Sequence, residues 1–252
     1  MTEDVTTGLD VLAFGAHPDD VEIGCGATLA TLVDRGRRVG IVHLTGGEAG
    51  TRGTPEGRRR EAQRSAEVLG VAVLEILDCG DGDLRTGTAE QDEVIGLLRR
   101  YRPDLVLAPA PSDRHPDHGR AHLLVREACF YAGLAGRGSG GEPFRPAATF
   151  SYMQHDPFEP SFVVDATAGW DRKMAALAEY KSQLYQPGGG DGPDEGRDEP
   201  PTKVASAVFY EAITGRARHF GMMIGVPFGE PFWSRLPPAV DDPLSLLPRG
   251  VR

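Results

Sequence analysis

The chain has 252 residues, of which 40% are hydrophobic and 25% are charged, and its formal net charge is −10. Such a length can bury a sizeable core, and single α/β domains often exceed roughly 200 residues. The acidic balance argues against nucleic-acid binding, which usually needs a basic surface. No stretch approaches the roughly 18 apolar residues of a membrane helix, and the polar N-terminus does not resemble a secretory signal. We therefore expect one cytoplasmic domain over residues 1–252, with neither a nucleic acid nor a membrane as partner.

The three cysteines are odd in number and have no C-x-x-C spacing. A disulfide framework or a four-cysteine zinc site is therefore not expected, and a reducing cytoplasm fits this composition. Cys25 lies near the first of the motifs described below, where we expect it to be a small buried packing residue.

Strand and helix patterns alternate through the first half of the chain. The apolar runs that indicate buried strands are 9–16, 38–47, 72–79 and 105–110. The helical patterns that follow them are 27–36, 56–69, 89–104 and 118–133. This alternation predicts a single Rossmann-like α/β domain, with a mostly parallel sheet of order 3-2-1-4-5 and helices on both faces.

The second half of the chain is predicted less fully. Two more strands are expected at 148–154 and 162–167, and a helix around 168–185. The segment "QPGGGDGPDEGRDEPPT", residues 186–202, is so rich in Gly, Pro and acidic residues that we expect a mobile loop. Nothing after it indicates a second domain.

Two clusters of His, Pro and Asp follow the first and the fourth predicted strands. They are "GAHPDDVEIG", residues 15–24, and "DRHPDH", residues 113–118. In the expected strand order these two strands are neighbours at the topological switch point, where ligands bind outside the carboxyl ends of the strands. We therefore expect the two clusters to meet in the folded protein.

The side chains that would meet can build a catalytic zinc site, in which two imidazoles and one carboxylate leave the fourth position open. His17 and Asp20 can converge across a tight turn, and His118 can be the third ligand. Zinc lowers the pKa of bound water and polarises a carbonyl, which suits hydrolysis of an amide or an ester. A remaining carboxylate can take the proton of the water, and a remaining histidine can stabilise the oxyanion or protonate the leaving group.

Other interpretations of these residues are weaker. Asp19 or Asp20 alone can cap the helix that begins near Val21. His118 and His122 form an i, i+4 pair, but the glutamate of H-E-x-x-H is absent. A dinucleotide fingerprint, a P-loop and the G-x-S-x-G elbow of serine hydrolases are also absent. A non-catalytic binding module would not explain an aspartate placed beside three metal ligands.

The residues "AHPDDVEIGCGATLA" and "DRHPDH" resemble the PIG-L/LmbE family of zinc-dependent N-acetylglucosaminide deacetylases. The likeness extends through "LTGGEAGTRGT", "RREAQRSAEVLGV", "FVVDAT", "KMAALAEYKSQ" and "HFGMMIGVPFGEPF", and so covers nearly the whole chain. This fuller pattern is similar to the branch that deacetylates N-acetylglucosaminyl-malate in bacillithiol biosynthesis. The resemblance implies a homo-oligomer, with a hexamer as the expected form.

The resemblance also implies roles for individual residues. It makes His17, Asp20 and His118 the zinc ligands, Asp19 the general base and His115 the electrostatic or acid partner. It makes Asp117 the residue that orients His115. Arg58 matches an arginine that grips a substrate carboxylate, although Arg59 and Arg60 leave the register open.

One departure from the family pattern concerns an oxyanion-stabilising tyrosine, which falls on Phe209 here, with Tyr210 adjacent. Either Tyr210 substitutes for it or the hydroxyl is missing. The expected activity is zinc-dependent removal of acetate from an N-acetylglucosamine conjugate, with the malate conjugate as the expected substrate. The alternatives are another N-acetyl sugar or thiol-sugar conjugate, or a metal-dependent sugar-binding protein. His₂Asp sites also accept iron, cobalt or nickel.

Overall fold

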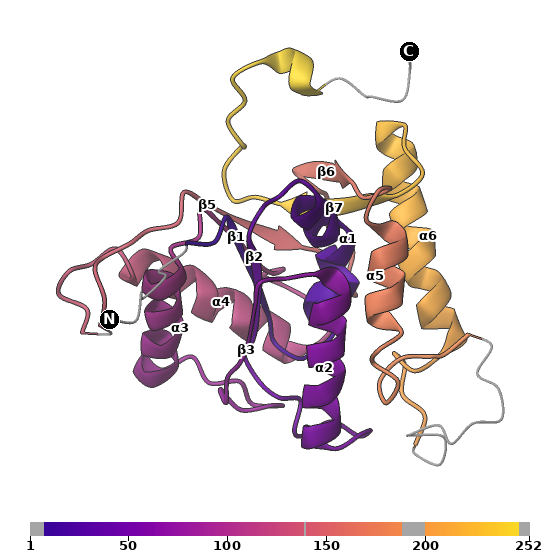
Figure 1. Cartoon of the computed structure of the whole chain (residues 1–252), viewed down its shortest axis with the longest axis horizontal. Helices are drawn as coiled ribbons and strands as arrows, with labels where there is room; N and C mark the ends of the chain where they lie inside the picture. Colours follow the sequence, from indigo (N-terminus) through magenta and orange to yellow (C-terminus); the bar gives the residue numbers. More distant parts are fainter. Residues whose placement is uncertain (1–7, 139, 188–199, 247–252) are drawn as a thin grey trace.

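The computed structural model describes residues 8–138, 140–187 and 200–246 (Figure 1). The strands are β1 Val11–Gly15, β2 Val39–His43, β3 Val73–Ile76, β4 Leu105–Pro109, β5 Ala148–Tyr152, β6 Phe162–Asp165 and β7 Gly229–Trp233. The helices are α1 Asp20–Asp34, α2 Pro55–Leu69, α3 Thr88–Tyr101, α4 Pro116–Tyr131, α5 Trp170–Leu177, α6 Ala207–Ile224 and the short 3-10 helix η1 Pro243–Leu246. Most of the predicted loop at 186–202 falls on residues 188–199, which lie outside the described residues.

The strands form one seven-stranded sheet of order β3-β2-β1-β4-β5-β7-β6. The strands from β3 to β5 are parallel, which confirms the predicted order 3-2-1-4-5. β7 then runs antiparallel to both β5 and β6. β1 and β4 are therefore adjacent, and their carboxyl ends lie side by side at the edge where the two motifs follow.

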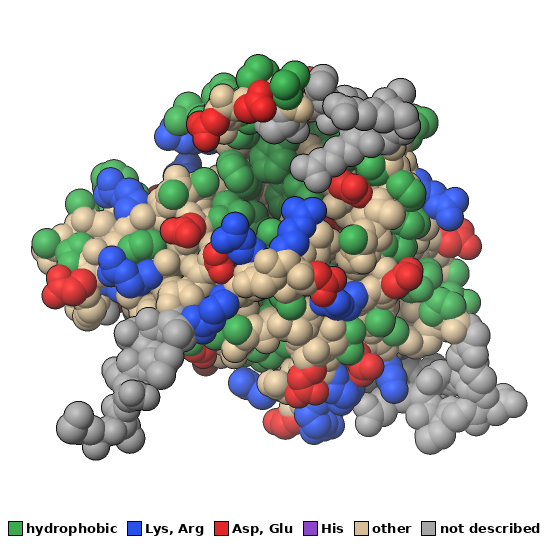
Figure 2. All heavy atoms as spheres, turned by 45° about the horizontal axis from the view of Figure 1, so that its top comes forward, with side chains coloured by type: hydrophobic (Ala, Val, Ile, Leu, Met, Phe, Trp, Pro, Cys, Tyr) green, Lys and Arg blue, Asp and Glu red, His purple; other side chains and the backbone are tan. Residues whose placement is uncertain are grey.

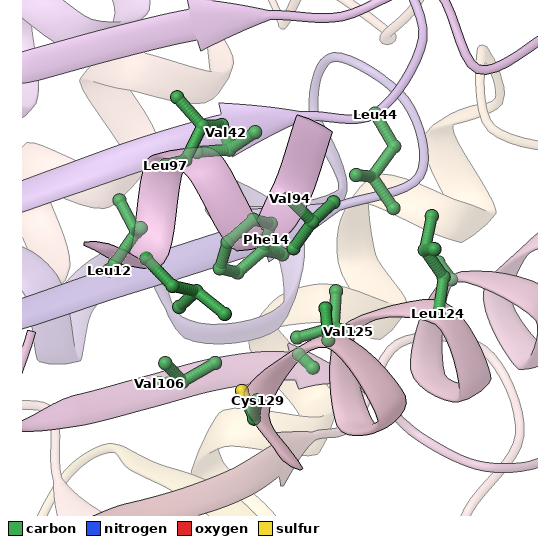
Figure 3. Packing of buried hydrophobic residues seen from close by; sticks show 14 of the residues in the cluster. Leu12, Phe14, Val42, Leu44, Val94, Leu97, Val106, Leu124, Val125 and Cys129 are labelled. Carbon is green, nitrogen blue, oxygen red and sulfur yellow. The ribbon is translucent and has the colours of Figure 1, made fainter. Parts of the chain in front are cut away.

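The central strands are buried on both faces, as expected for a parallel sheet covered by helices. Alternate residues of β1 point to opposite faces: Leu12 and Phe14 pack with α3 and α4 (Figure 3), whereas Val11 and Ala13 pack with α1 and α2. Figure 1 shows α3 and α4 on one side of the sheet and α1, α2, α5 and α6 on the other. The two helical layers predicted from the alternating pattern are confirmed.

Helix α6 and strand β7 were not predicted as elements from the sequence. The signals for α6 were present, since Ser206 caps its N-terminus by accepting a hydrogen bond from the Phe209 amide, and Gly225 ends it in the left-handed conformation. β7 inserts between β5 and β6 by antiparallel pairing. Such long-range pairing leaves no local pattern in the sequence.

Helix α1 is broken at Cys25, whose φ of −144° and ψ of 18° are not helical. The break leaves backbone amides and carbonyls without helical partners, and buried charged side chains of other elements form hydrogen bonds with them. The Glu230 carboxylate of β7 accepts hydrogen bonds from the amides of Ala27 and Thr28 at 3.2 and 2.7 Å. The Lys173 ammonium donates to the Ile23 carbonyl at 2.9 Å and to Glu230 at 2.6 Å. The first turn of α1 is thus held from α5 and β7.

The three cysteines are buried and free, and Cys25 packs in the core cluster beneath α1. This agrees with the packing role expected for Cys25. Among the described residues, no helix is long and apolar enough to cross a membrane.

We predict that Glu230→Gln lowers the free energy of unfolding by about 3 to 5 kcal/mol, because it leaves the buried Lys173 charge without its partner. Burial already lowers the pKa of Lys173, against the opposing charge of Glu230. Urea unfolding checks this value. Arg37→Ala, which removes an exposed ion pair with Asp10, should cost about 1 kcal/mol or less. Equal losses in the two variants would contradict the role given to Glu230.

Candidate metal centre

The first motif forms a tight turn between β1 and α1. The Asp20 carboxylate accepts a hydrogen bond from the backbone N–H of His17 at 2.8 Å, and this closes the turn. Asp19 lies between them at the helix N-terminus with a φ of 102°, in a region that non-glycine residues rarely occupy. Such backbone strain persists where the surrounding structure imposes it, and it clusters at functional sites.

Asp20 joins the two motifs. One of its carboxylate oxygens lies 3.3 Å from Nε2 of His118, and the other lies 3.5 Å from Nδ1 of His17. All three residues are buried, with exposed fractions of 8% or less. The three residues predicted as metal ligands are therefore in contact through one carboxylate, although His118 lies more than 90 positions after the other two in sequence.

Each imidazole has further carboxylates on its other nitrogen. Nε2 of His17 lies 3.0 Å from an oxygen of Asp81 and 3.4 Å from an oxygen of Asp117. Nδ1 of His118 lies 3.3 Å from an oxygen of Asp113. Carboxylates in this position orient a metal-bound imidazole and raise its basicity. Asp81 was not predicted from sequence, and Asp113 was recognised in the motif without a role.

These carboxylates control the charge of both imidazoles. Burial lowers the pKa of His17, but Asp117, Asp20 and Asp81 outweigh it and raise that pKa well above its ordinary value. Burial is likewise outweighed at His118, where Asp20 and Asp113 raise the pKa to about 9. The site therefore attracts positive charge, and a divalent cation competes there with protons for the same nitrogens.

The donor atoms are suited to zinc. In one group, the ligand atoms of His17, His115 and His118 all lie within 4.8 Å of one another. Two further groups within this limit are Asp113, His118 and His155, and His17, Asp81 and Asp117. Imidazole nitrogens with a carboxylate oxygen are the ligands of catalytic zinc sites. The residues present thus fit the expected metal.

Asp19 is buried, but its carboxylate accepts no hydrogen bond from the described residues. It stands at the N-cap of α1, yet its side chain makes no capping hydrogen bond, and the residue keeps 8% exposure. Burial, reinforced by the charge of Asp20, raises the pKa of Asp19 to about 8. A divalent cation held by the adjacent residues would lower this pKa. Helix capping therefore does not explain the Asp19 side chain, and its role as a general base stays a prediction.

His115 and Asp117 contact each other differently from the expectation. The backbone N–H of Asp117 donates a hydrogen bond to Nδ1 of His115 at 3.3 Å, whereas the Asp117 carboxylate makes no hydrogen bond to His115. The Asp117 carboxylate instead accepts from the amides of Gly82 and Leu84 and from Arg120. Burial and the nearby charges of His17 and His118 lower the pKa of His115. Both effects favour the neutral imidazole, and the Asp117 N–H on Nδ1 places the proton of that form on Nε2.

The loop after β2 lies against the first motif, as expected from the adjacency of β1 and β2. Arg58 is 5% exposed and donates to the Gly47 carbonyl at 2.6 Å and to the Pro18 carbonyl at 3.2 Å. Gly47 has a φ of +71°, and a Cβ there would lie 1.8 Å from the Arg58 guanidinium. Arg59 and Arg60 are exposed. Arg58 is thus the arginine of this run that faces the motif.

The position of the expected tyrosine also lies beside the site. The Phe209 ring lies 5.3 Å from the His155 ring, which stacks at 5.7 Å on His118. Tyr210 packs its ring 6.1 Å from Tyr185, and among the described residues no hydrogen bond or ring contact joins its side chain to the two motifs. His155 belongs to neither motif, and only the pairing of β5 with β4 brings it beside the site.

His122 is separate from the cluster. Its Nδ1 lies 3.0 Å from the Pro109 carbonyl and 3.2 Å from the Ser151 hydroxyl, and its ring contacts Trp233. The i, i+4 pair of His118 and His122 therefore does not converge on one point. Gln154 is a further residue missed by sequence analysis, and its side-chain amide donates to Asp20 at 2.6 Å.

The fold and the site define an α/β protein with a candidate His/Asp metal centre at the switch point of its sheet. Residues 12–129 match the family described as PIG-L: GlcNAc-PI de-N-acetylase. A diacetylchitobiose deacetylase of Thermococcus kodakarensis is 35% identical over 189 residues, covering 69% of this chain and 70% of the relative. The chain belongs to the PIG-L family.

Two other similarities bear on function. A conserved protein of Thermus thermophilus superimposes with a TM-score of 0.82 and 37% identity, over 93% of this chain and 98% of that one. A 4-oxalmesaconate hydratase of Pseudomonas putida is 28% identical over 183 residues, covering 66% of this chain and 70% of that protein. The fold is therefore shared by proteins with different named activities.

The first prediction for the site concerns zinc content. His118→Ala should lose most bound zinc, because it removes one of two imidazoles that meet Asp20, whereas His122→Ala should retain it. Elemental analysis of the purified variants measures the bound metal, and thermal unfolding checks that both are folded. Equal zinc content in folded forms of the two variants would refute this ligand assignment.

The second prediction concerns Asp19. Asp19→Asn keeps the size of the side chain but cannot accept a proton, and loss of a general base costs roughly a hundredfold to ten-thousandfold in rate. Bound zinc should stay near the wild-type level while kcat for deacetylation collapses. A fall in kcat of less than about tenfold would show that Asp19 is not the base.

Proposed function

We propose that this protein is a zinc-dependent deacetylase that removes acetate from an N-acetylglucosamine conjugate. The observation that carries the proposal is the buried Asp19 carboxylate, free of hydrogen bonds from the described residues, beside Asp20 and the imidazoles that Asp20 contacts. A base next to a metal centre is the arrangement that amide hydrolysis requires. Membership of the PIG-L family supports the same reaction class.

Each residue has a defined task in this reaction. His17, Asp20 and His118 would hold zinc, which when bound lowers the pKa of a coordinated water and polarises a carbonyl. Asp19 accepts the proton of the attacking water. Neutral His115, whose Nδ1 accepts the Asp117 N–H, has an N–H on Nε2 that can donate to the developing oxyanion. Asp117 and Asp113 hold the imidazoles of His17 and His118 in place.

The finer substrate assignment is N-acetylglucosaminyl-malate, as in bacillithiol biosynthesis. Malate has carboxylates, and Arg58 is the buried guanidinium that faces the motif. Its two hydrogen bonds to backbone carbonyls use two of the five N–H donors of an arginine, and its Nε has no partner among the described residues. Free donors on a planar guanidinium suit a substrate carboxylate. We propose this contact for Arg58.

Tyr210 is the proposed source of a second oxyanion donor. In the structure its neighbour Phe209 is the residue that packs toward His155. The proposal for Tyr210 therefore requires its side chain to turn from Tyr185 toward the site. Tyr210→Phe measures its contribution directly, since it removes only the hydroxyl, and an unchanged kcat would eliminate Tyr210 from the mechanism.

The hydratase relative makes the reaction class the first thing to test, because one fold can host several chemistries. Incubating the zinc-loaded protein with N-acetylglucosaminyl-malate and measuring free acetate tests the proposal. Release of acetate by wild type but not by Asp19→Asn would support it. Zinc-dependent hydration of an unsaturated dicarboxylate without any deacetylase activity would overturn it, and sugar binding without turnover would leave a binding protein.

The proposal extends to assembly and location. We propose a cytoplasmic homo-oligomer, with a hexamer as the expected form. Large apolar side chains are exposed on α6, namely Val208, Met222 and Met223, and on the C-terminal segment, namely Leu236 and Leu244. Figure 2 shows hydrophobic side chains gathered in a hollow on one face. Exposed apolar patches mark interaction sites. Light scattering coupled to gel filtration would measure the mass, and a monomer would contradict this proposal.

For substrate recognition, Arg58→Ala should lower kcat/KM more for the malate conjugate than for uncharged N-acetylglucosamine. The difference should correspond to a loss of transition-state stabilisation of about 2 to 3 kcal/mol. The reason is that only the malate conjugate offers a carboxylate to the guanidinium. The exposed neighbour Arg59 provides the matched control, because Arg59→Ala removes the same positive charge from a side chain that does not face the motif. If both substrates lose activity equally, Arg58 acts by holding the Gly47 loop, and the malate assignment loses its local support.

A further inference from the structure

Gln154 follows β5 and contacts the site from the side opposite to the Gly47 loop. It is 1% exposed, and its amide Nε2 donates to Oδ1 of Asp20 at 2.6 Å. The other oxygen of the same carboxylate, Oδ2, accepts the His17 N–H at 2.8 Å. Each oxygen of Asp20 therefore has one fixed donor. Two donors on two oxygens set both the position of the carboxylate and the orientation of its plane.

Gln154 is itself held by a half-buried cation. Arg216 of α6 donates through Nη1 to the Gln154 carbonyl and through Nη2 to the Ile23 carbonyl, the latter at 3.0 Å. Ile23 lies in the first turn of α1, the turn that Asp20 begins. One guanidinium thus connects the segment that carries Gln154 to the helical turn that carries Asp20. The next residue, His155, fixes the same segment by donating its N–H to Asp113 at 3.0 Å.

We infer that Gln154 is a positioning residue for the metal ligand Asp20, and that Arg216 acts on the metal centre through Gln154. This inference rests on the metal site of the proposed function. Gln154 occupies one acceptor position of Oδ1 and leaves the rest of that oxygen directed toward His118, which lies 3.3 Å away. Loss of such outer hydrogen bonds typically weakens metal binding or activity by roughly 10- to 100-fold.

The test compares zinc affinities of purified full-length variants by competition with a chromogenic chelator. Gln154→Met keeps the length of the side chain but cannot donate, and its Kd for zinc should rise roughly 10- to 100-fold. Ser151→Ala is the matched control. Ser151 is buried on the strand that leads to Gln154, but its hydroxyl contacts His122 outside the site. Its zinc Kd should equal that of wild type. Thermal unfolding of the metal-free proteins separates a loss of affinity from a loss of fold.

A double-mutant cycle tests the connection from Arg216. Arg216→Lys keeps the positive charge but not the guanidinium that donates to two carbonyls at once, and it should weaken zinc binding when Gln154 is present. In the Gln154→Met background the same substitution should have little further effect, because interacting residues are not additive. Additive losses would show that Arg216 does not act through Gln154. Cobalt-substituted protein provides a second measurement, since its visible absorption bands should shift in Gln154→Met and not in Ser151→Ala.

The outcomes distinguish this inference from the proposed function. If wild type binds zinc and Gln154→Met binds it equally well with unchanged cobalt spectra, Gln154 does not position Asp20, and the metal site stands without it. If wild type binds no zinc, the site and this inference both fail. Weaker binding by Gln154→Met, with metal-free stability and the Ser151→Ala control unchanged, establishes the positioning role.

Discussion

The position of the first turn of α1 depends on the side chains that form hydrogen bonds with the backbone around the break at Cys25. A helix broken near its start exposes carbonyls at the end of one piece and amides at the start of the next, and buried backbone groups of this kind must find partners. The Ile23 carbonyl accepts hydrogen bonds from both Lys173 and Arg216. The two amides after the break donate hydrogen bonds to the Glu230 carboxylate. Three ionisable side chains from three different elements therefore fix a turn of a few residues. Asp20 begins this turn, so its placement against His118 depends on a charge network more than on helix propensity.

The same logic explains the concentration of carboxylates around the imidazoles. Asp20, Asp81, Asp113 and Asp117 surround His17 and His118, and buried anions are costly without a counter-charge. Because the pKa values of both imidazoles are raised, protons on these imidazoles supply part of the positive counter-charge. A divalent cation supplies it more compactly, and outer carboxylates on the far nitrogens then orient the ligands. The arrangement is thus more consistent with a centre built to hold metal than with a salt-bridged core.

The sequence was sufficient for the part of this structure that follows local pattern. Alternating apolar runs predicted the strand order through β5, and the rule for the switch point brought His17 and His118 together. It was insufficient where placement depends on pairing between distant segments. Gln154 and His155 follow an ordinary strand and carry no motif, so their approach to Asp20 and His118 depends on β5 pairing with β4. Asp81 comes from a loop after β3, and α6 was missed although its caps were present.

This division also explains why the motifs indicate chemistry more clearly than substrate. The proposed metal ligands and Asp19 lie on turns fixed by the central strands, where the backbone has little freedom to vary. The groups that border the site come from elsewhere: Arg58 from α2, His155 from the segment after β5, and Phe209 from α6. These segments can change without disturbing the sheet, and relatives named as a diacetylchitobiose deacetylase and a hydratase share the fold. We therefore propose that substrate choice in this chain depends on how α2 and α6 border a centre whose own geometry is set by β1 and β4.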